Sequence, residues 1–276
     1  MASLIEATAL SPVASGFAVE LDQGWDIWGP AGGYIAAIAL RAVGERAPPG
    51  HRPVTLTGQF VRVAKPGTLD VKVEPVKQGA TALFVVTLAQ DDQPVFLAQV
   101  WTTSRNDASH CLQPAMPEVQ QPLTLRGQDE IAAERGITQL AFWHNIEGRP
   151  VNFRTYNDPA SSDERQFRWM RFRDWTATDD PFVDAMRSVL LIDIGVWPAH
   201  WHRLTEPAAY VAPSLDLTVW FHGDRPAGEW LLSDAVSDLS GNGTISGQVR
   251  IWSEDGRAMA TGGGHCLVVL PKAGNA

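Results

Sequence analysis

The sequence predicts an α+β fold made of two copies of one unit, in which an apolar helix is followed by a meander of antiparallel strands. The order of segments indicates this, because a helix-like stretch and four strand-like segments recur in the second half of the chain. The 276 residues are 45% hydrophobic and 19% charged, a globular composition with enough chain for two domains of ordinary size.

The first unit starts with a helix over 34–47. Small and bulky apolar residues surround most of its circumference, as in a helix buried inside a protein, and Pro48 and Pro49 end it. Apolar and charged side chains then alternate over 69–75, the pattern of a half-buried strand. The predicted strands of this unit are 54–63, 69–78, 80–90 and 95–103.

The second unit repeats this order after a polar, proline-bearing stretch. Residues 106–140 are predicted to link an N-terminal domain at 1–105 to a C-terminal domain at 141–276, with a short helix near 128–136. An apolar helix is expected over 184–204, with a break near Asp193. The predicted strands are 143–157, 164–175, 214–222, 229–238, 244–252 and 257–270.

An internal repeat relates the two units. Phe60 corresponds to Phe221, a shift of 221 − 60 = 161 residues, and the same shift places Gly32 on Asp193, since 193 − 32 = 161. The same point on the helix therefore carries a glycine in one unit and a carboxylate in the other. Because a curled sheet leaves an open edge, we expect the two units to join their sheets.

Charge and composition exclude several classes of function. The net charge of −9 and the pI of about 5.2 argue against a nucleic-acid partner, which needs clustered Lys and Arg. A polyanionic ligand could still meet a local basic patch, although a solvated face is the plainer interpretation. The candidate arginines are Arg41, Arg46 and Arg52, or Arg165, Arg168, Arg171 and Arg173.

Motifs for other chemistries are missing from the sequence. There is no GxSxG, GxxxxGK[ST] or GxGxxG, and Cys111 and Cys266 form neither a disulfide framework nor a zinc spacing, so we expect no cofactor and no metal. The N-terminal residues lack the pattern of a signal peptide, and no apolar run approaches 18 residues. We therefore expect a cytoplasmic protein with no membrane partner.

Several segments together resemble the double-hotdog acyl-CoA thioesterases, a family similar to bacterial thioesterase II. They are WGPAGGYIAAIALRA in the first half and IEGRPVNF, FRWMRFRD, VLLIDIGVWPA and SLDLTVWFH in the second. The resemblance covers nearly the whole chain and is weakest over 104–140. It implies a tandem (double) hotdog, each half a curled antiparallel sheet wrapped around a central helix, with an acyl-CoA substrate. Since hotdog units associate through their sheets, a homo-oligomer is expected.

The resemblance also implies a catalytic trio of Asp, Thr or Ser, and Gln. The first two carry over to Asp193 and Ser214, but no Gln stands near the C-terminus. His265 takes its place if one glycine of the preceding triplet is an inserted bulge, and Gly264 does otherwise. In this interpretation Asp193 takes a proton from the attacking water, Ser214 orients that water, and His265 holds it or acts as a second base.

The start of the first helix is the expected site for the oxyanion. Gly32, Gly33 and Tyr34 lie where backbone N–H groups, those of Gly33 and Tyr34 above all, should be free and the helix dipole favours negative charge. Two plainer interpretations stay open: the glycines only permit tight packing of the helix on the sheet, and Asp193 only caps a helix. The acyl chain is expected to lie against Trp197, Trp201 or Trp220.

Two other functions remain possible at this stage. A hotdog enoyl-thioester hydratase or dehydratase would use an Asp with a His, and His265 beside Asp193 would fit that pair. A non-catalytic acyl-CoA-binding protein would explain the missing Gln. Release of free thiol from acyl-CoA distinguishes hydrolysis from both.

Overall fold

The computed structural model describes residues 2–106, 112–155, 157–159, 163–223 and 228–270. Parts of the predicted linker (107–111) and of a predicted turn (224–227) lie outside these residues. The helices are α1 (Leu4–Ala7), α2 (Gly32–Gly44), α3 (Gln128–Glu134) and α4 (Pro181–Arg203), with single turns of 3₁₀ helix at η1 (Gln23–Trp25), η2 (Pro122–Thr124) and η3 (Ala141–Asn145). The strands are β1 (Ser11–Val13), β2 (Gly16–Glu20), β3 (Arg52–Phe60), β4 (Thr68–Lys77), β5 (Thr81–Gln90), β6 (Gln93–Thr103), β7 (Ile146–Pro150), β8 (Arg165–Phe172), β9 (Asp216–Phe221), β10 (Leu231–Gly241), β11 (Thr244–Ser253) and β12 (Ala258–Leu267).

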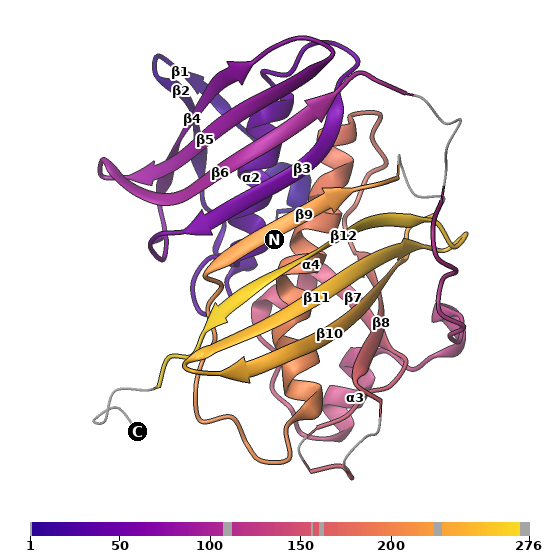
Figure 1. The fold of residues 1–276 in the computed structure, drawn as a ribbon. Helices are drawn as coiled ribbons and strands as arrows, with labels where there is room; N and C mark the ends of the chain where they lie inside the picture. The colour runs from indigo at the N-terminus through magenta and orange to yellow at the C-terminus, as the bar shows by residue number, and fades with distance from the viewer. Residues whose placement is uncertain (1, 107–111, 156, 160–162, 224–227, 271–276) are drawn as a thin grey trace.

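All twelve strands of the described chain form one antiparallel sheet, in which corresponding strands of the two halves follow in the same order from each outer edge to the centre. The order is β1-β2-β4-β5-β6-β3-β9-β12-β11-β10-β8-β7, so β2-β4-β5-β6-β3 in the first half is mirrored by β8-β10-β11-β12-β9 in the second. Figure 1 shows the two helices α2 and α4 behind this curled sheet. The predicted tandem hotdog is confirmed.

The two halves join at β3 and β9. Thr57 pairs with Thr218, and 218 − 57 = 161, the shift found in the sequence repeat. The neighbouring pairs, Thr55 with Trp220 and Gln59 with Asp216, are symmetric about this point. The inner edge of each half is therefore covered by the other, which removes two of the exposed edges that separate units would carry.

The two long helices touch on the concave side of the sheet, at the glycine pair. A Cβ atom built on Gly33 would lie 2.6 Å from Cα of Leu190, and one on Gly32 would lie 2.8 Å from Oδ1 of Asp193. Only glycine allows α2 and α4 to approach this closely. The predicted tight packing is thus present, although it is between two helices rather than between helix and sheet.

Helix α4 differs from its prediction in two respects. It starts earlier, at Pro181, because the side chain of Asp180 accepts hydrogen bonds from the N–H groups of Phe182 and Val183. It is also continuous through Asp193, so the predicted break is wrong and Asp193 is no N-cap. Packing against α2 and against β10, β11 and β12 keeps this segment helical. No helix in the described chain is long and apolar enough to cross a membrane.

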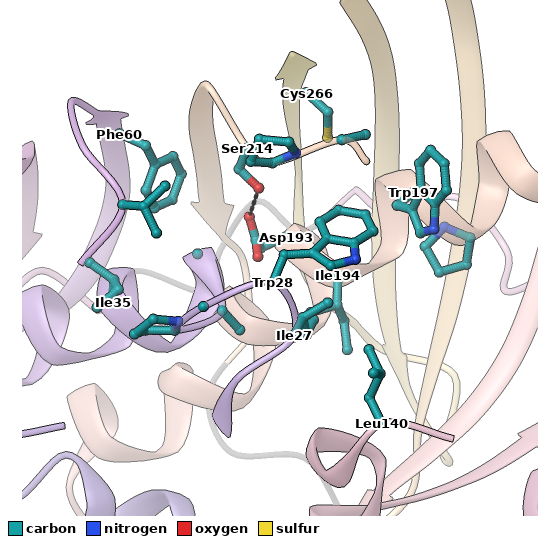
Figure 2. Close-up of a pocket in the computed structure, with 18 of the residues that line it drawn as sticks. Ile27, Trp28, Ile35, Phe60, Leu140, Asp193, Ile194, Trp197, Ser214 and Cys266 are labelled. Atoms are coloured by element: carbon teal, nitrogen blue, oxygen red, sulfur yellow. Dashed lines mark hydrogen bonds between the residues drawn. The ribbon is translucent and has the colours of Figure 1, made fainter. Parts of the chain in front are cut away.

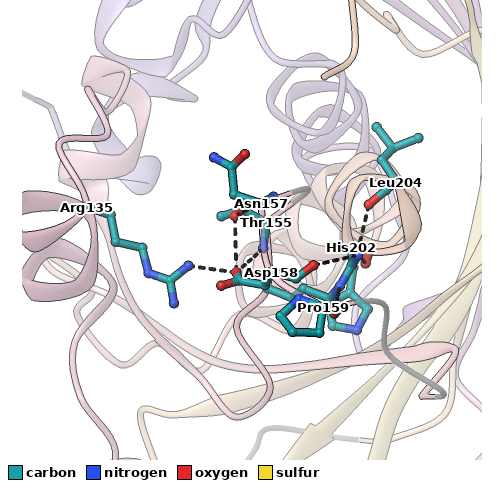
Figure 3. A network of polar contacts seen from close by, with 8 residues as sticks. Arg135, Thr155, Asn157, Asp158, Pro159, His202 and Leu204 are labelled. Carbon is teal, nitrogen blue, oxygen red and sulfur yellow. Dashed lines mark hydrogen bonds and ion pairs between the residues drawn. The ribbon is translucent and has the colours of Figure 1, made fainter. Parts of the chain in front are cut away.

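The segment 143–157 is also less regular than predicted, since β7 is the only strand among its described residues, 143–155 and 157. The loop beyond β7 caps the C-terminal end of α4 (Figure 3). The guanidinium of Arg154 donates to the carbonyls of His202 and Leu204, and Asp158 holds the loop by accepting from Thr155 N at 2.7 Å and Arg135 Nη1 at 2.7 Å. Carbonyls that the helix leaves unpaired are satisfied in this way.

Candidate active site

Asp193 lies where the two helices and the second half of the sheet meet. Its Oδ2 accepts a 2.6 Å hydrogen bond from the backbone N–H of Gly33, and its Oδ1 accepts a 2.7 Å bond from the hydroxyl of Ser214. Gly33 belongs to the first half of the chain, and Ser214 to the second. The repeat therefore produces a composite site, with the carboxylate of one copy on the helix start of the other.

The surroundings of Asp193 act on its carboxyl group in opposite directions. Burial raises the pKa of Asp193 above its ordinary value, and the hydrogen bonds from Ser214 and Gly33 lower it in part. A carboxylate displaced in this direction is a stronger base than one in water. Each carboxylate oxygen keeps a lone pair beyond the donor that it already has. Asp193 can therefore still accept a proton from a water.

A third side chain reaches the site, and it is Cys266 of β12. Ser214 pairs with Cys266 through an isolated β-bridge, which places the two side chains together. Burial, followed by the charges of Asp193 and Asp216, raises the pKa of the Cys266 thiol to about 12. This thiol is thus protonated at neutral pH, and a thiolate nucleophile is absent.

His265 is not brought to Asp193. Its ring Nδ1 lies 3.0 Å from Oδ2 of Asp216, its side chain is 52% exposed, and it does not line the cavity that contains Asp193. The predicted glycine bulge is wrong, because β11 and β12 stay in register from Thr244 to Ile251. His265 therefore faces away, whereas its neighbour Cys266 faces inward.

The glycine run before His265 explains why the family glutamine is missing. A Cβ atom on Gly262, Gly263 or Gly264 would lie 2.1 to 2.2 Å from a carbonyl oxygen of an adjacent strand. A side chain cannot be placed there without moving that strand. The closely packed glycines of β12 thus exclude Gln at position 264, the alternative position for the third residue.

The predicted oxyanion donors are only partly available. The N–H of Gly33 is bound to Asp193, and the N–H of Tyr34 donates to the carbonyl of Ala31 at 3.0 Å, so the prediction that both are free is wrong. The hydroxyl of Tyr34 is also engaged, donating to the carbonyl of Ala7. Among the described residues Gly32 has no acceptor for its N–H, and it lines the cavity. Gly32 is the amide left for an incoming ligand.

A cavity of about 550 Å³ opens beside Asp193 and Ser214. This is within the usual size range of small-molecule sites. Figure 2 shows Phe60 on one side of the carboxylate and Trp197 and Leu140 on the other. Of the predicted tryptophans, Trp197 and Trp201 line the cavity, but Trp220 does not and is 48% exposed.

The predicted basic patches are mostly occupied by partners within the protein. Arg41 donates to Ile5 O and Thr8, and three arginines of the second patch form ion pairs. The pairs are Arg165 with Asp234, Arg171 with Glu147 and Glu229, and Arg173 with Asp129. Arg168 is the exception, since it has no carboxylate partner among the residues that the structure describes, and it lines the cavity.

Both halves of the chain match the same family of proteins. The acyl-CoA thioesterase N-terminal domain matches residues 21–103, and the acyl-CoA thioesterase C-terminal domain matches residues 117–264. The chain belongs to the acyl-CoA thioesterase family. It is accordingly a thioester hydrolase, and the double-hotdog resemblance found in the sequence is confirmed.

Individual relatives of this thioesterase are distant in sequence. Human acyl-coenzyme A thioesterase 8 is 24% identical over 86% of this chain and 81% of its own length. A hotdog protein from Alicyclobacillus acidocaldarius superimposes with a TM-score of 0.83 at 24% identity, covering 98% of this chain and 99% of that one. Acyl-CoA thioesterase II from Mycobacterium marinum superimposes with a TM-score of 0.79 at 21% identity, covering 98% of this chain and 99% of that one.

A polyketide dehydratase domain from Mycobacterium tuberculosis also shares the fold, with a TM-score of 0.55 at 13% identity over 98% of this thioesterase and 100% of that chain. Such likenesses show the architecture alone, since one fold supports many reactions. The function must be argued from the site.

Cys266 is a site residue that sequence reasoning missed, and Arg168 was named only as one of four arginines of a possible basic patch. Alternation along the last strand could have found Cys266, because its immediate neighbour His265 faces the other side of the sheet. No comparable signal marked Arg168. It lies in a strand with arginine at every third position, and the fold shows that Arg165 and Arg171 have carboxylate partners while Arg168 has none among the described residues.

Proposed function

We propose that this thioesterase hydrolyses acyl-CoA to the free acid and CoA by attack of a water that Asp193 activates. The observation that supports this is the position of the Asp193 carboxylate, buried in an apolar cavity and hydrogen-bonded by Gly33 and Ser214. A general base needs a fixed orientation and a pKa near its working range. Burial raises the pKa of Asp193 in the direction of that range, and the two donors fix the orientation of the carboxylate.

In the reaction, Asp193 accepts a proton from the water while the water oxygen attacks the thioester carbonyl. The C–S bond then breaks, the proton held by Asp193 passes to the departing sulfur so that CoA leaves as the thiol and the carboxylate is restored, and the carbonyl becomes the free acid. The hydroxyl of Ser214 donates to Asp193, so its oxygen remains able to accept from the same water. Both carboxylate oxygens are already bound, which favours proton transfer over direct attack by Asp193.

The negative charge that develops on the carbonyl oxygen requires a donor. We assign this role to the backbone N–H of Gly32, at the N-terminus of α2. Gly33 contributes indirectly because its N–H fixes Asp193. Cys266, protonated beside Ser214, closes the site on the third side.

The two alternative functions lose their motivating observations. The hydratase required a histidine next to Asp193, and none of the described residues that line the cavity is a histidine. The non-catalytic interpretation rested on the missing Gln, but an oriented carboxylate and an unpaired amide are present without it. The cytoplasmic location and the homo-oligomeric state stay predictions.

The direct test is steady-state hydrolysis of saturated acyl-CoAs of increasing chain length, followed by release of free thiol. We expect turnover by the wild-type chain and a loss of kcat of about 10²-fold or more in Asp193→Asn, the scale of one positioned acid–base group. Asn fits the same space and can bond both Gly33 and Ser214, so the loss reports the base.

His265→Ala is the matched control because that side chain is exposed and bonded to Asp216. Its kcat should stay within about twofold of wild type. Full activity of Asp193→Asn, or a collapse in His265→Ala, would reject the assignment. Loss of enoyl absorbance without thiol release would support the hydratase instead.

A further inference from the structure

The cavity continues past the catalytic carboxylate along one face of α4. Asp193, Trp197 and Trp201 are spaced four residues apart, so they share that face, and all three line the cavity. At 1.5 Å per residue, Trp201 lies ~12 Å beyond Asp193 along the helix. Leu140 and Trp143 line the same far end. The far end therefore accommodates the distal part of an acyl chain.

A buried cation lies at this far end. Arg168 of β8 is 8% exposed and lines the cavity, with its guanidinium 5.5 Å from the ring centroid of Trp143. It is near the end of α4, since its charge is among the causes that lower the pKa of His202. None of its nitrogens donates a hydrogen bond to a described residue, and Nε is fully enclosed.

Other arginines of the same strand are paired. Arg165 is bonded to Asp234, and Arg171 to Glu147 and Glu229, on the outer face of the sheet. Arg168 lies an odd number of residues from both, so its side chain points to the other face, toward the cavity. For Arg168, burial alone lowers the pKa, to about 10, with no acidic group opposing it. The guanidinium is thus still protonated at neutral pH.

An unpaired charge of this kind destabilises the fold unless something compensates it. A ligand carboxylate would compensate the charge with a favourable free energy of binding, because the guanidinium is already dehydrated and fixed before the ligand arrives. A purely hydrocarbon chain would instead leave Arg168 buried without a partner. The phosphates of CoA are a poor fit at this buried cation, whereas the exposed Arg62 also lines the cavity and is open to solvent.

We propose that Arg168 binds a carboxylate at the distal end of the acyl chain, so that the preferred substrates are ω-carboxyacyl-CoA thioesters. This inference rests on the proposed function and specifies its substrate class. With C–C bonds of ~1.5 Å, a chain that covers the ~12 Å from Asp193 has roughly eight to ten carbon atoms. The carboxylate pairs with the guanidinium, and the intervening methylenes pack on Trp197 and Trp201.

The test compares octanoyl-CoA with 7-carboxyheptanoyl-CoA, which have the same number of acyl carbons and differ in the terminal group. We expect kcat/KM to be at least about tenfold higher for the carboxylated thioester in the wild-type chain. In Arg168→Met, which keeps an apolar stem, this ratio should fall about tenfold or more, while octanoyl-CoA is hydrolysed as well as before or better. Arg171→Met, a paired arginine of the same strand, should leave the ratio unchanged.

Equal kcat/KM for the two thioesters in the wild-type chain, or an unchanged ratio in Arg168→Met, overturns the proposal. If Arg168→Met does not fold, the wild-type ratio and Arg168→Lys, which retains the charge, still decide it. Calorimetric binding of both thioesters to Asp193→Asn separates the two hypotheses. A binding preference for the carboxylated thioester, together with no hydrolysis of either thioester by the wild-type chain, would refute the proposed function and keep the role of Arg168.

Discussion

The crossing of α2 and α4 at Gly33 should tolerate no larger residue. In Gly33→Ala the new Cβ would lie 2.6 Å from Cα of Leu190, and ordinary contact starts near 3.4 Å, so the helices must separate by 3.4 − 2.6 = 0.8 Å. Alanine favours a helix over glycine by up to ~1 kcal/mol. Overpacking of a buried site costs about 1–3 kcal/mol, and here the obstacle is backbone. We therefore expect a net loss of stability.

The same movement would weaken catalysis. A separation of this size lengthens the 2.6 Å bond from Gly33 N to Oδ2 of Asp193, so the base loses its orientation. Urea unfolding and thiol release, measured on the same preparation, test both effects. Gly241→Ala is the control, since nothing lies within 4 Å of its added Cβ. Equal unfolding free energies for the two variants and for wild type would refute the packing argument.

Three further predictions concern the groups around Asp193. Ser214→Ala should lower kcat by roughly tenfold to a hundredfold. It should also move the acid limb of the pH–rate profile to higher pH, because the hydrogen bond from Ser214 lowers the pKa of Asp193 and its loss lets that pKa rise. An acid limb that stays in place would contradict this. Asp193→Asn should raise the melting temperature at pH 7 by roughly 2–4 °C. Burial places the folded-state pKa of Asp193 above its ordinary 3.8, so the stability from this group is full below that value and is lost as the pH rises through the folded-state pKa. The difference should vanish in melts near pH 3.5, and a gain that is independent of pH would speak against it. Cys266→Ser should keep kcat within about threefold, since a thiol with a pKa of about 12 is not a nucleophile at neutral pH. A hundredfold loss would indicate a thiolate mechanism.

The fold could be predicted because its signals are local and occur twice. The buried helix over 34–47, the strand alternation and the 161-residue shift each rest on side-chain periodicity, and the symmetric pairing of Thr57 with Thr218 follows from the same shift. Asp193 and Ser214 could be predicted from the family resemblance. The contact of Asp193 with Gly33 depends on how the two halves meet, and the shift had already marked Asp193 and Gly32 as equivalent positions of the two helices.

The wrong predictions concern the direction in which a side chain points and the partners that a polar group has, rather than which helices and strands exist. His265 was misplaced because a single residue of register reverses the face that a strand side chain occupies, and the sequence does not show whether a glycine run contains a bulge. The free amides of Gly33 and Tyr34 were expected from the ends of an isolated helix, whereas tertiary contacts occupy both. The lack of a partner at Arg168 is likewise a property of the packed structure.

The most direct test of the account is a single turnover of acyl-CoA by excess enzyme in water enriched in ¹⁸O, followed by mass spectrometry of the released acid and of the peptide that contains Asp193. If Asp193 removes a proton from water, the label enters the acid and the carboxyl group of residue 193 stays unlabelled. Label in the Asp193 carboxyl group would show that this side chain attacks the thioester itself, and the proposed role as a base would be wrong.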